Sequence, residues 1–294
     1  MRTREAINGY LFFSPWLIGL IVFSAGPILY SLYLSFTSYN IHSPPKWIGT
    51  LNYQILFTED PLFWQSLYNT LYYVVFSVPL GTVAGVLMAV LLNQKVKGLG
   101  VWRTIFYLPS VVSIVVVSLL WQWIFDPTFG LINTALAQIG IEGPGWLQDR
   151  AWSKPALIIM SLWGVGGGMI IYLAGLQGIS RELYEAATVD GAGRMRQFFN
   201  ITIPMLTPTI FFNLIMGVLG AMQVFVQAFI MTAGGPVNST MFYALYLYNK
   251  AFRDLQMGYA SAMAWVLLVI SLIFTLIIIR TSRSWVYYEG AEPR

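Results

Sequence analysis

The chain has 294 residues, of which 57% are hydrophobic and 10% charged, and its mean hydropathy is +0.67. A soluble domain carries about 25% charged residues, so this composition argues against a soluble protein and indicates an integral membrane protein. The net charge of +4 does not indicate nucleic-acid binding, because lysine and arginine flank the predicted membrane spans. The lack of cysteine excludes thiolate metal sites, and the single histidine, His42, argues against a histidine-based metal centre or catalytic triad.

Six stretches are long and apolar enough to cross a membrane as helices, which takes about 20 residues each. They run over about 10–38, 66–93, 103–125, 155–178, 205–232 and 258–279. Pro15 and Pro27 predict a tilted or kinked first helix. We therefore expect an all-α, polytopic membrane protein with six transmembrane helices in a single domain over residues 1–294.

The distribution of positive charge predicts the orientation of the chain. With six spans, both ends of the chain lie on the same side of the membrane. Eleven of the sixteen lysines and arginines fall on that side, Lys95 and Arg294 among them. Because loops in the cytoplasm carry the excess of positive charge, both termini are expected to be cytoplasmic, and so is the loop between the fourth and fifth spans.

That loop, residues 180–204, is unusually polar for this chain. Ser180 is expected to cap a helix, and Glu182 lies in its first turn, where a negative charge favours the helix dipole. Gly191 and Gly193 are expected to end this helix in a sharp turn.

A second short helix is expected from Arg194 to Asn200. Pro204 and Pro208 suit the first turns of the membrane helix that follows, where a missing N–H matters least. The segment is therefore predicted to form a helix–glycine–helix projection with a charged tip, which we call the knob (residues 180–204).

One string in the knob fits a long and specific pattern, E-A-A-x(3)-G-x(9)-I-x-L-P, with isoleucine in place of the commoner leucine. Its residues are Glu185, Ala186, Ala187, Gly191, Ile201, Ile203 and Pro204. The string resembles the EAA loop of ABC-importer permeases. Stretches along nearly the whole chain, such as LFFSPWLIGLIVFSAGPILYSLYLSF and TAGGPVNSTMFYALYLYNKAF, resemble sugar permeases of the maltose and glycerol-3-phosphate importer class.

The chain most resembles the shorter, six-span members of the first-permease type, which implies a type I ABC-importer permease fold. The resemblance implies a subunit that forms half of the pore of an ATP-driven, binding-protein-dependent importer of sugars, oligosaccharides above all. It also implies the partners: a second, homologous permease in a heterodimer, two cytoplasmic ATPase subunits, and an extracytoplasmic solute-binding protein at a prokaryotic inner membrane. Whether the second permease is a distinct chain or another copy is open.

In such permeases the EAA loop docks into a cleft of the ATPase. Carried over to this chain, Glu185 would pair with a basic group of the ATPase, and Gly191 would make the turn. The remaining coupling residues would be Ala186, Ala187, Asp190 and Pro204. The alternative is a solvated loop whose charges only set the topology, but topology alone does not require this spacing of glycine and proline.

The chain lacks the G-x(4)-G-K-[ST] phosphate loop, so we expect it not to be an enzyme and to bind no cofactor of its own. ATP and Mg²⁺ would be held by the partner ATPase. A membrane enzyme would need clustered His, Asp or Glu, and the acidic residues Glu182, Glu185 and Asp190 stand without a histidine or a nucleophile.

No carboxylate lies within a predicted span, which argues against proton-coupled transport. Neutral polar and aromatic groups suit a sugar. The family's site near mid-membrane points to Trp163 and Gly164 in span four, with glycines there that permit close packing or a local break. In span five it points to Asn213, Gly217, Gln223 and Gln227. These four do not share one helical stripe, so some are expected to make interhelical hydrogen bonds instead.

Two alternatives remain open at this point. The same machinery would also suit glycerol-3-phosphate or a polyol, although the absence of arginine among the predicted site residues favours a neutral sugar. A stand-alone secondary carrier is a different class, but it would not need the knob.

The GGPVNST stretch from Gly234 to Thr240 is either a contact for a binding protein or a tight turn before a surface helix.

Overall fold

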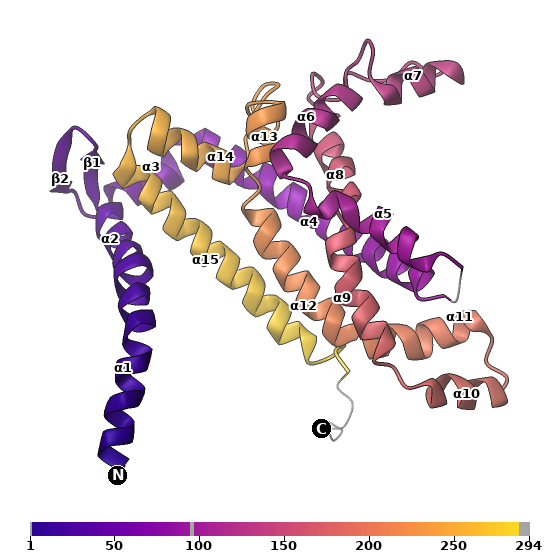
Figure 1. Cartoon of the computed structure of the whole chain (residues 1–294). Coiled ribbons are helices and arrows are strands. Elements are labelled where there is room, and N and C mark those ends of the chain that lie inside the picture. The colour runs from indigo at the N-terminus through magenta and orange to yellow at the C-terminus, as the bar shows by residue number, and fades with distance from the viewer. Residues whose placement is uncertain (1, 95–96, 288–294) are drawn as a thin grey trace. The chain divides into compact units, whose positions relative to one another are not determined.

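The computed structural model describes residues 2–94 and 97–287 and is mainly helical (Figure 1). Lys95 and Arg294, which were used to predict the orientation, lie outside the described residues. The α-helices are α1 (Arg2–Leu20), α2 (Gly26–Ser35), α3 (Leu51–Thr58), α4 (Pro61–Leu92), α5 (Leu99–Val111), α6 (Ile114–Ile124), α7 (Leu131–Gln138), α8 (Ser153–Trp163), α9 (Gly166–Gln177), α10 (Arg181–Val189), α11 (Arg194–Gln197), α12 (Ile203–Met222), α13 (Val226–Met231), α14 (Tyr243–Tyr248) and α15 (Met257–Ser282). The π-helical turns are η1 (Ile21–Ala25), η2 (Phe198–Thr202) and η3 (Asn249–Arg253), and the strands are β1 (Thr37–Asn40) and β2 (Ser43–Trp47).

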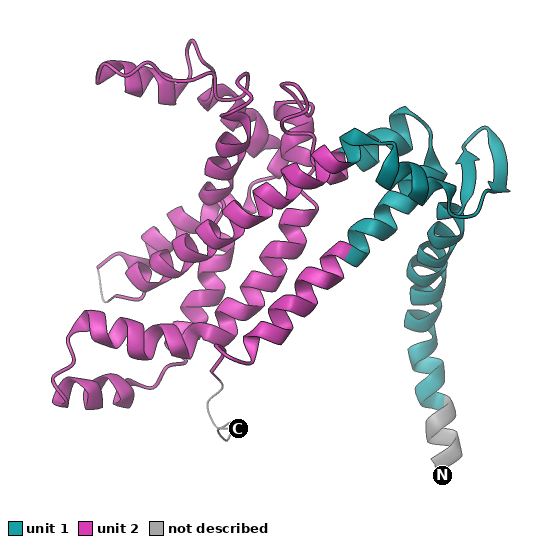
Figure 2. Cartoon of the chain, turned by 180° about the vertical axis from the view of Figure 1, so that it is seen from behind, with its two compact units in different colours: residues 1–63, 246–269 teal, residues 64–245, 270–294 magenta. Residues whose placement is uncertain are grey.

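The chain divides into two compact units (Figure 2). Unit 1 consists of residues 1–63 and 246–269, and unit 2 consists of residues 64–245 and 270–294. Two long helices, α4 and α15, contribute residues to both units.

Four helical stretches of the described residues are long and apolar enough to cross a membrane. They are Asn8–Ser35, Pro61–Leu92, Arg194–Met231 and Met257–Ser282. Two pairs of helices also qualify, α5 with α6 and α8 with α9, but they are bent by 98° and 47°. By length and composition the number of spans is therefore four, or up to six if each bent pair is one span.

The span predicted over 103–125 consists of two helices, α5 and α6, with a sharp bend between them. Val112 and Ser113 take extended backbone conformations, with ψ of 137° and 134°, which interrupt the helix. Pro109 precedes them inside α5 and removes one helical N–H donor.

The bend between α8 and α9 falls at Gly164 and Val165, where a local break or close packing was predicted. Both occur. The helix breaks at this point, and a Cβ at Gly166 would overlap the backbone carbonyl of Phe106, so the glycine permits close approach of α9 to α5.

The predicted separate helix from Arg194 to Asn200 is not present as such. The chain stays helical from α11 through the π-turn η2 into α12. At the end of that turn the N–H of Ile203 donates to the carbonyl oxygen of Phe198, five residues earlier. A π-turn of this kind accommodates a proline in a continuous helix, because it alters the hydrogen-bond register just before Pro204, which has no N–H. A similar turn, η1, precedes Pro27.

Unit 1 contains a small antiparallel hairpin that the sequence did not predict. β2 has the sequence SPPKW, and its two prolines are tolerated because the sheet has only two strands and leaves an edge free. His42 lies in the turn between the strands, and the described residues contain no cluster of three or more metal-binding side chains.

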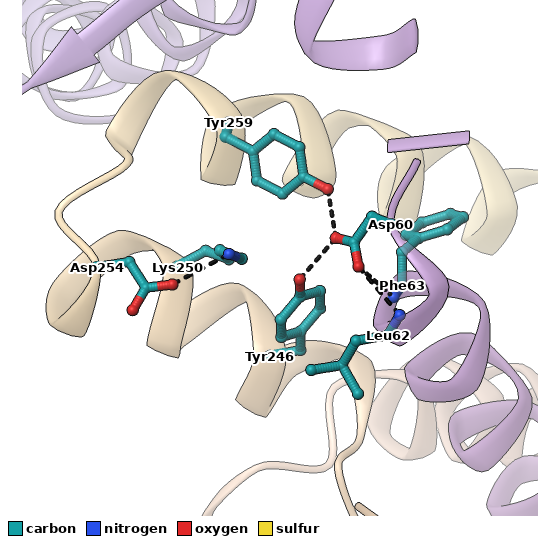
Figure 3. A network of polar contacts seen from close by, with 7 residues as sticks. All are labelled: Asp60, Leu62, Phe63, Tyr246, Lys250, Asp254 and Tyr259. Carbon is teal, nitrogen blue, oxygen red and sulfur yellow. Dashed lines mark hydrogen bonds and ion pairs between the residues drawn. The ribbon is translucent and has the colours of Figure 1, made fainter. Parts of the chain in front are cut away.

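The Asp60 carboxylate joins three helices within unit 1 (Figure 3). One oxygen, Oδ1, accepts hydrogen bonds from the backbone N–H groups of Leu62 (3.0 Å) and Phe63 (3.1 Å) and so caps α4. The other, Oδ2, accepts from the Tyr246 hydroxyl at 2.6 Å and the Tyr259 hydroxyl at 2.5 Å. Burial acts to raise the pKa of the Asp60 carboxyl, but these four hydrogen bonds outweigh it, so the pKa lies below the ordinary value of 3.8.

Asp60→Asn is expected to lower the melting temperature of the protein at pH 7 by a few degrees. A carboxyl whose pKa is lower in the folded state stabilises the fold above its unfolded pKa, and this contribution is lost as the pH falls through the folded value. The difference between wild type and variant should therefore shrink as the pH falls below about 4. Thermal unfolding in detergent measures it. The exposed neighbour Glu59, changed to Gln, is the control, and a difference that stayed constant with pH would contradict this role of Asp60.

Unit 2 has a hydrophobic core where α4, α9 and the start of α12 meet. Its buried members include Ala89 of α4, Met169 and Tyr172 of α9, and Leu206 of α12. In both views α10 and α11 lie at the opposite end of unit 2 from α7 and α13 (Figures 1 and 2). The core therefore anchors the helices that carry the knob.

Candidate functional site

The first helix of the knob begins and ends with well-formed caps. The Ser180 hydroxyl accepts a hydrogen bond from the N–H of Glu182, as the sequence predicted. At the other end Gly191 has φ of +77°, and its N–H donates to the carbonyl of Thr188. The N–H of Ala192 donates to the carbonyl of Ala187 at 2.8 Å. These two bonds form a Schellman motif, which needs a left-handed residue at the position of Gly191.

Side chains within the knob hold its two arms together. Gln197 Nε2 donates to Thr188 Oγ1 at 2.9 Å and to the carbonyl oxygen of Ala192 at 3.0 Å. The hydroxyls of Tyr184 and Thr202 lie 3.0 Å apart. The knob is therefore braced by hydrogen bonds at its turn and at its base.

The predicted coupling residues lie on this braced frame. Glu185, Ala186 and Asp190 are exposed, whereas Ala187 is half-buried. Within the described part of the chain, no lysine, arginine or histidine forms an ion pair with Glu185. Ala187 and Asp190 also line a small cleft of about 200 Å³ between α10 and α11. Pro204 lies in the first turn of α12.

The knob also exposes apolar side chains that the sequence analysis did not single out. Val189 is 88% exposed and Met195 is 73% exposed.

A first cavity, cavity A, lies between α4, α8, α9 and α12 in unit 2 and has a volume of about 290 Å³. Its polar lining consists of Tyr73, Ser77, Thr82, Ser161, Tyr172 and Asn213. Of the predicted substrate residues, Asn213 and Gly217 line it. Asn213 Nδ2 donates to the carbonyl of Thr209 at 3.0 Å within its own helix, which fixes the orientation of the amide.

A second cavity, cavity B, has a volume of about 300 Å³ and lies between α4, α5, α6 and α8, with one residue from α13. Trp163, Gly164 and Gln227 line it, and it shares Tyr73 and Ser161 with cavity A. No lysine, arginine, histidine, aspartate or glutamate lines either cavity among the residues that the structure describes.

The predicted substrate residues therefore do not form one site: some line cavity A, some line cavity B, and one lines neither. Gln223 lines neither cavity, is exposed, and donates through Nε2 to the carbonyl of Leu219 at 3.2 Å. The reason is a break in the helix: α12 ends at Met222 and α13 starts at Val226. The sequence analysis missed Tyr73 and Ser161, the two residues common to both cavities. Among the described residues, Tyr73 is the one aromatic residue that lines both cavities. Its hydroxyl, a polar group within an apolar predicted span, is the sequence feature that could have identified it.

Comparison with known proteins gives a consistent result. A model of the family described as "Binding-protein-dependent transport system inner membrane component" matches residues 81–284. The chain is 46% identical to the probable ABC transporter permease protein YesP of Bacillus subtilis over 98% of this chain and 94% of the relative. It is 40% identical to the lactose transport system permease protein LacF of Rhizobium radiobacter, with 92% of each chain covered.

A solved structure is similar over almost the full length. It is the crystal structure of a bacterial alginate ABC transporter in complex with an alginate pentasaccharide-bound periplasmic protein. The TM-score is 0.83 at 27% identity, and the match covers 95% of each chain.

Proposed function

This chain belongs to the family of binding-protein-dependent transport system inner membrane components, and from that premise we propose that it forms half of the pore of an ATP-driven importer of sugars, oligosaccharides above all. It is a permease subunit of an ABC importer, and members of this family are not the catalytic subunits.

The knob is the observation that carries the proposal. All residues of the EAA string lie on one capped and braced projection, and Glu185 is exposed at its surface without a basic partner in the described part of the chain. A carrier that worked alone would gain nothing from such a projection. A subunit that receives work from an ATPase needs a rigid handle, and this geometry supplies one.

The choice of cargo rests on two observations. Relatives carry names that refer to lactose and to alginate, both of which are carbohydrates. Cavities A and B present hydroxyl, amide and aromatic groups such as Tyr73, Ser161 and Asn213, without a charged side chain in the described residues. Such groups suit a sugar, which binds through hydrogen bonds of its hydroxyls and through stacking of its ring.

The proposed assembly contains a second homologous permease as the partner in a heterodimer, two cytoplasmic ATPase subunits that hold ATP and Mg²⁺, and an extracytoplasmic solute-binding protein. The last of these is supported by the similar alginate transporter, which was crystallised with a periplasmic protein. Both termini and the knob lie on the cytoplasmic side in this proposal, in agreement with the distribution of lysine and arginine.

The mechanism follows from the connection of the knob to the helices. ATP closes the ATPase dimer, and the docked knob moves with it. Because α11 continues through η2 into α12, this motion is transmitted to a helix that lines cavity A. The cavity then alternates between the two sides of the membrane through rigid-body motion of packed helices.

Blocking cavity A tests the assignment of the cargo pathway. Gly81 lines the cavity and has open space around its Cβ position, so Gly81→Phe should fold and fill part of the space. Sugar uptake by proteoliposomes with the complete importer is expected to fall at least tenfold. Gly100 has the same open surroundings but lines neither cavity, so Gly100→Phe is the matched control.

Uptake that survived Gly81→Phe would remove cavity A from the pathway. Transport by the chain alone, without ATPase subunits, would contradict the proposed function as a whole and favour a secondary carrier. Import of glycerol-3-phosphate or a polyol in place of sugars would leave the machinery intact and change only the cargo.

A further inference from the structure

Lys154, in the first turn of α8, is held by three neighbours within unit 2. Its Nζ donates to Asn69 Oδ1 at 3.0 Å and lies 5.2 Å from the ring centroids of both Tyr68 and Tyr72. Asn69 is fully buried, and its Nδ2 donates to the backbone carbonyls of residues 238 and 241. The position of the ammonium is therefore fixed by an amide that cannot turn and by two aromatic faces.

This ammonium has no acidic partner among the described residues. Lys250, by contrast, forms an ion pair with Asp254, at 3.1 Å. Arg150, four residues before Lys154 in the turn that precedes α8, adds a second positive charge that acts on it. A partly buried cation without a counter-ion is costly, because its loss of hydration is not offset by a nearby negative charge.

Lys250 gives an internal comparison. Its Nζ lies 5.5 Å and 5.7 Å from the ring centroids of Tyr246 and Tyr259, much as Lys154 lies over its own two tyrosines. Lys250 differs in having the carboxylate of Asp254 beside it. Among the described residues, Lys154 and Lys250 thus each lie over a pair of tyrosines, and Lys154 is the one without an acidic partner.

Lys154 lies on the same helix face as a residue that lines both cavities. Asn69, Tyr73 and Ser77 are spaced by four residues and share one face of α4, whereas Lys154 and Ser161 are two turns apart on one face of α8. Tyr73 and Ser161 line both cavities, so the Cα atom of Lys154 lies about 10 Å along α8 from that of Ser161 in this shared wall. Lys154 lies on the side of the cavities that faces away from the knob, which is the entrance side in the proposed orientation.

The unused hydrogen-bond donors of Lys154 indicate which ligand it could bind. An ammonium has three N–H donors, and Asn69 takes one. Two donors remain for a group that can accept both. Tyr68 is 61% exposed, so a sugar ring has access to an aromatic surface beside the charge. A carboxylate on a sugar ring satisfies both features.

On the basis of the proposed function, we infer that Lys154, with Tyr68 and Tyr72, forms an entrance subsite for the carboxylate of an acidic sugar, such as a uronate residue of an oligosaccharide. This inference modifies the expectation of a neutral cargo. The cavities themselves accept neutral parts of the ligand, and the charged group is recognised before them.

Binding of two probes tests the subsite: digalacturonate, and its dimethyl ester, which has the same shape without the charge. The permease is purified with its partner permease and ATPase subunits in nanodiscs, without the binding protein, and weak binding is measured by saturation-transfer NMR. Wild type is expected to bind the acid about tenfold more tightly than the ester, a difference of about 1.4 kcal/mol. Lys154→Gln should bring the two within twofold, and Lys154→Arg should keep a preference.

Lys250→Gln is the matched control and should keep the wild-type preference, because Lys250 is already neutralised by Asp254. Equal binding of acid and ester by wild type, no binding of the acid, or a preference that survives Lys154→Gln would overturn the inference. ATP-driven uptake by the same complexes in proteoliposomes, with the binding protein added, reports on the proposed function separately.

Discussion

Replacing Gly191 by threonine is expected to lower ATP-driven sugar uptake at least tenfold, with little effect on assembly of the importer. Gly191 has φ of +77°, a conformation that a β-branched residue adopts only with strain. Space is not the obstacle, because no atom lies within 4 Å of its Cβ position. The strain should open the Schellman turn and shift the carbonyl of Ala192, to which Gln197 donates.

Gly193→Thr is the matched control. Gly193 also has open space at its Cβ position, but its φ of −68° and ψ of 165° suit any residue, and it occupies the N-cap of α11, which favours threonine. This variant is expected to keep at least half of the wild-type uptake. If the two variants behaved alike, the turn geometry would not be what transmits the work. ATPase activity in nanodiscs separates uncoupling from loss of assembly.

The parts of the knob that the sequence predicted depend on local rules. A serine cap, a glycine in the left-handed region and a proline in the first helical turn each act over a few residues, so Ser180, Gly191 and Pro204 were placed correctly along the chain. The hydrogen bonds of Gln197 could not be predicted, because they depend on how α10 and α11 fold back on each other. The continuous helix from α11 through η2 into α12 was not predicted either, because a π-turn has no fixed sequence pattern.

The cavities were harder to predict for a physical reason. In a soluble helix the apolar face identifies the core, but in a membrane span every face is apolar, so periodicity does not tell which residues face inward. Gln223 was grouped with Asn213 because a helix was assumed to continue through Met222. The contact between Lys154 and Asn69 joins residues 85 positions apart and has no local pattern at all.

Glu185→Lys is expected to reduce uptake by about 10- to 100-fold, because it would place a second positive charge against the basic group of the ATPase that we propose as its partner. Glu182 lies three residues earlier in α10 and is also exposed, so Glu182→Lys makes the same change of net charge on the same helix. Its effect should be small, limited to the loss of a favourable interaction with the helix N-terminus. A basic-to-acidic change in the ATPase cleft should restore uptake to Glu185→Lys and not to Gly191→Thr. Equal losses in the two charge variants would instead indicate a general effect of positive charge and would remove Glu185 from the docking contact.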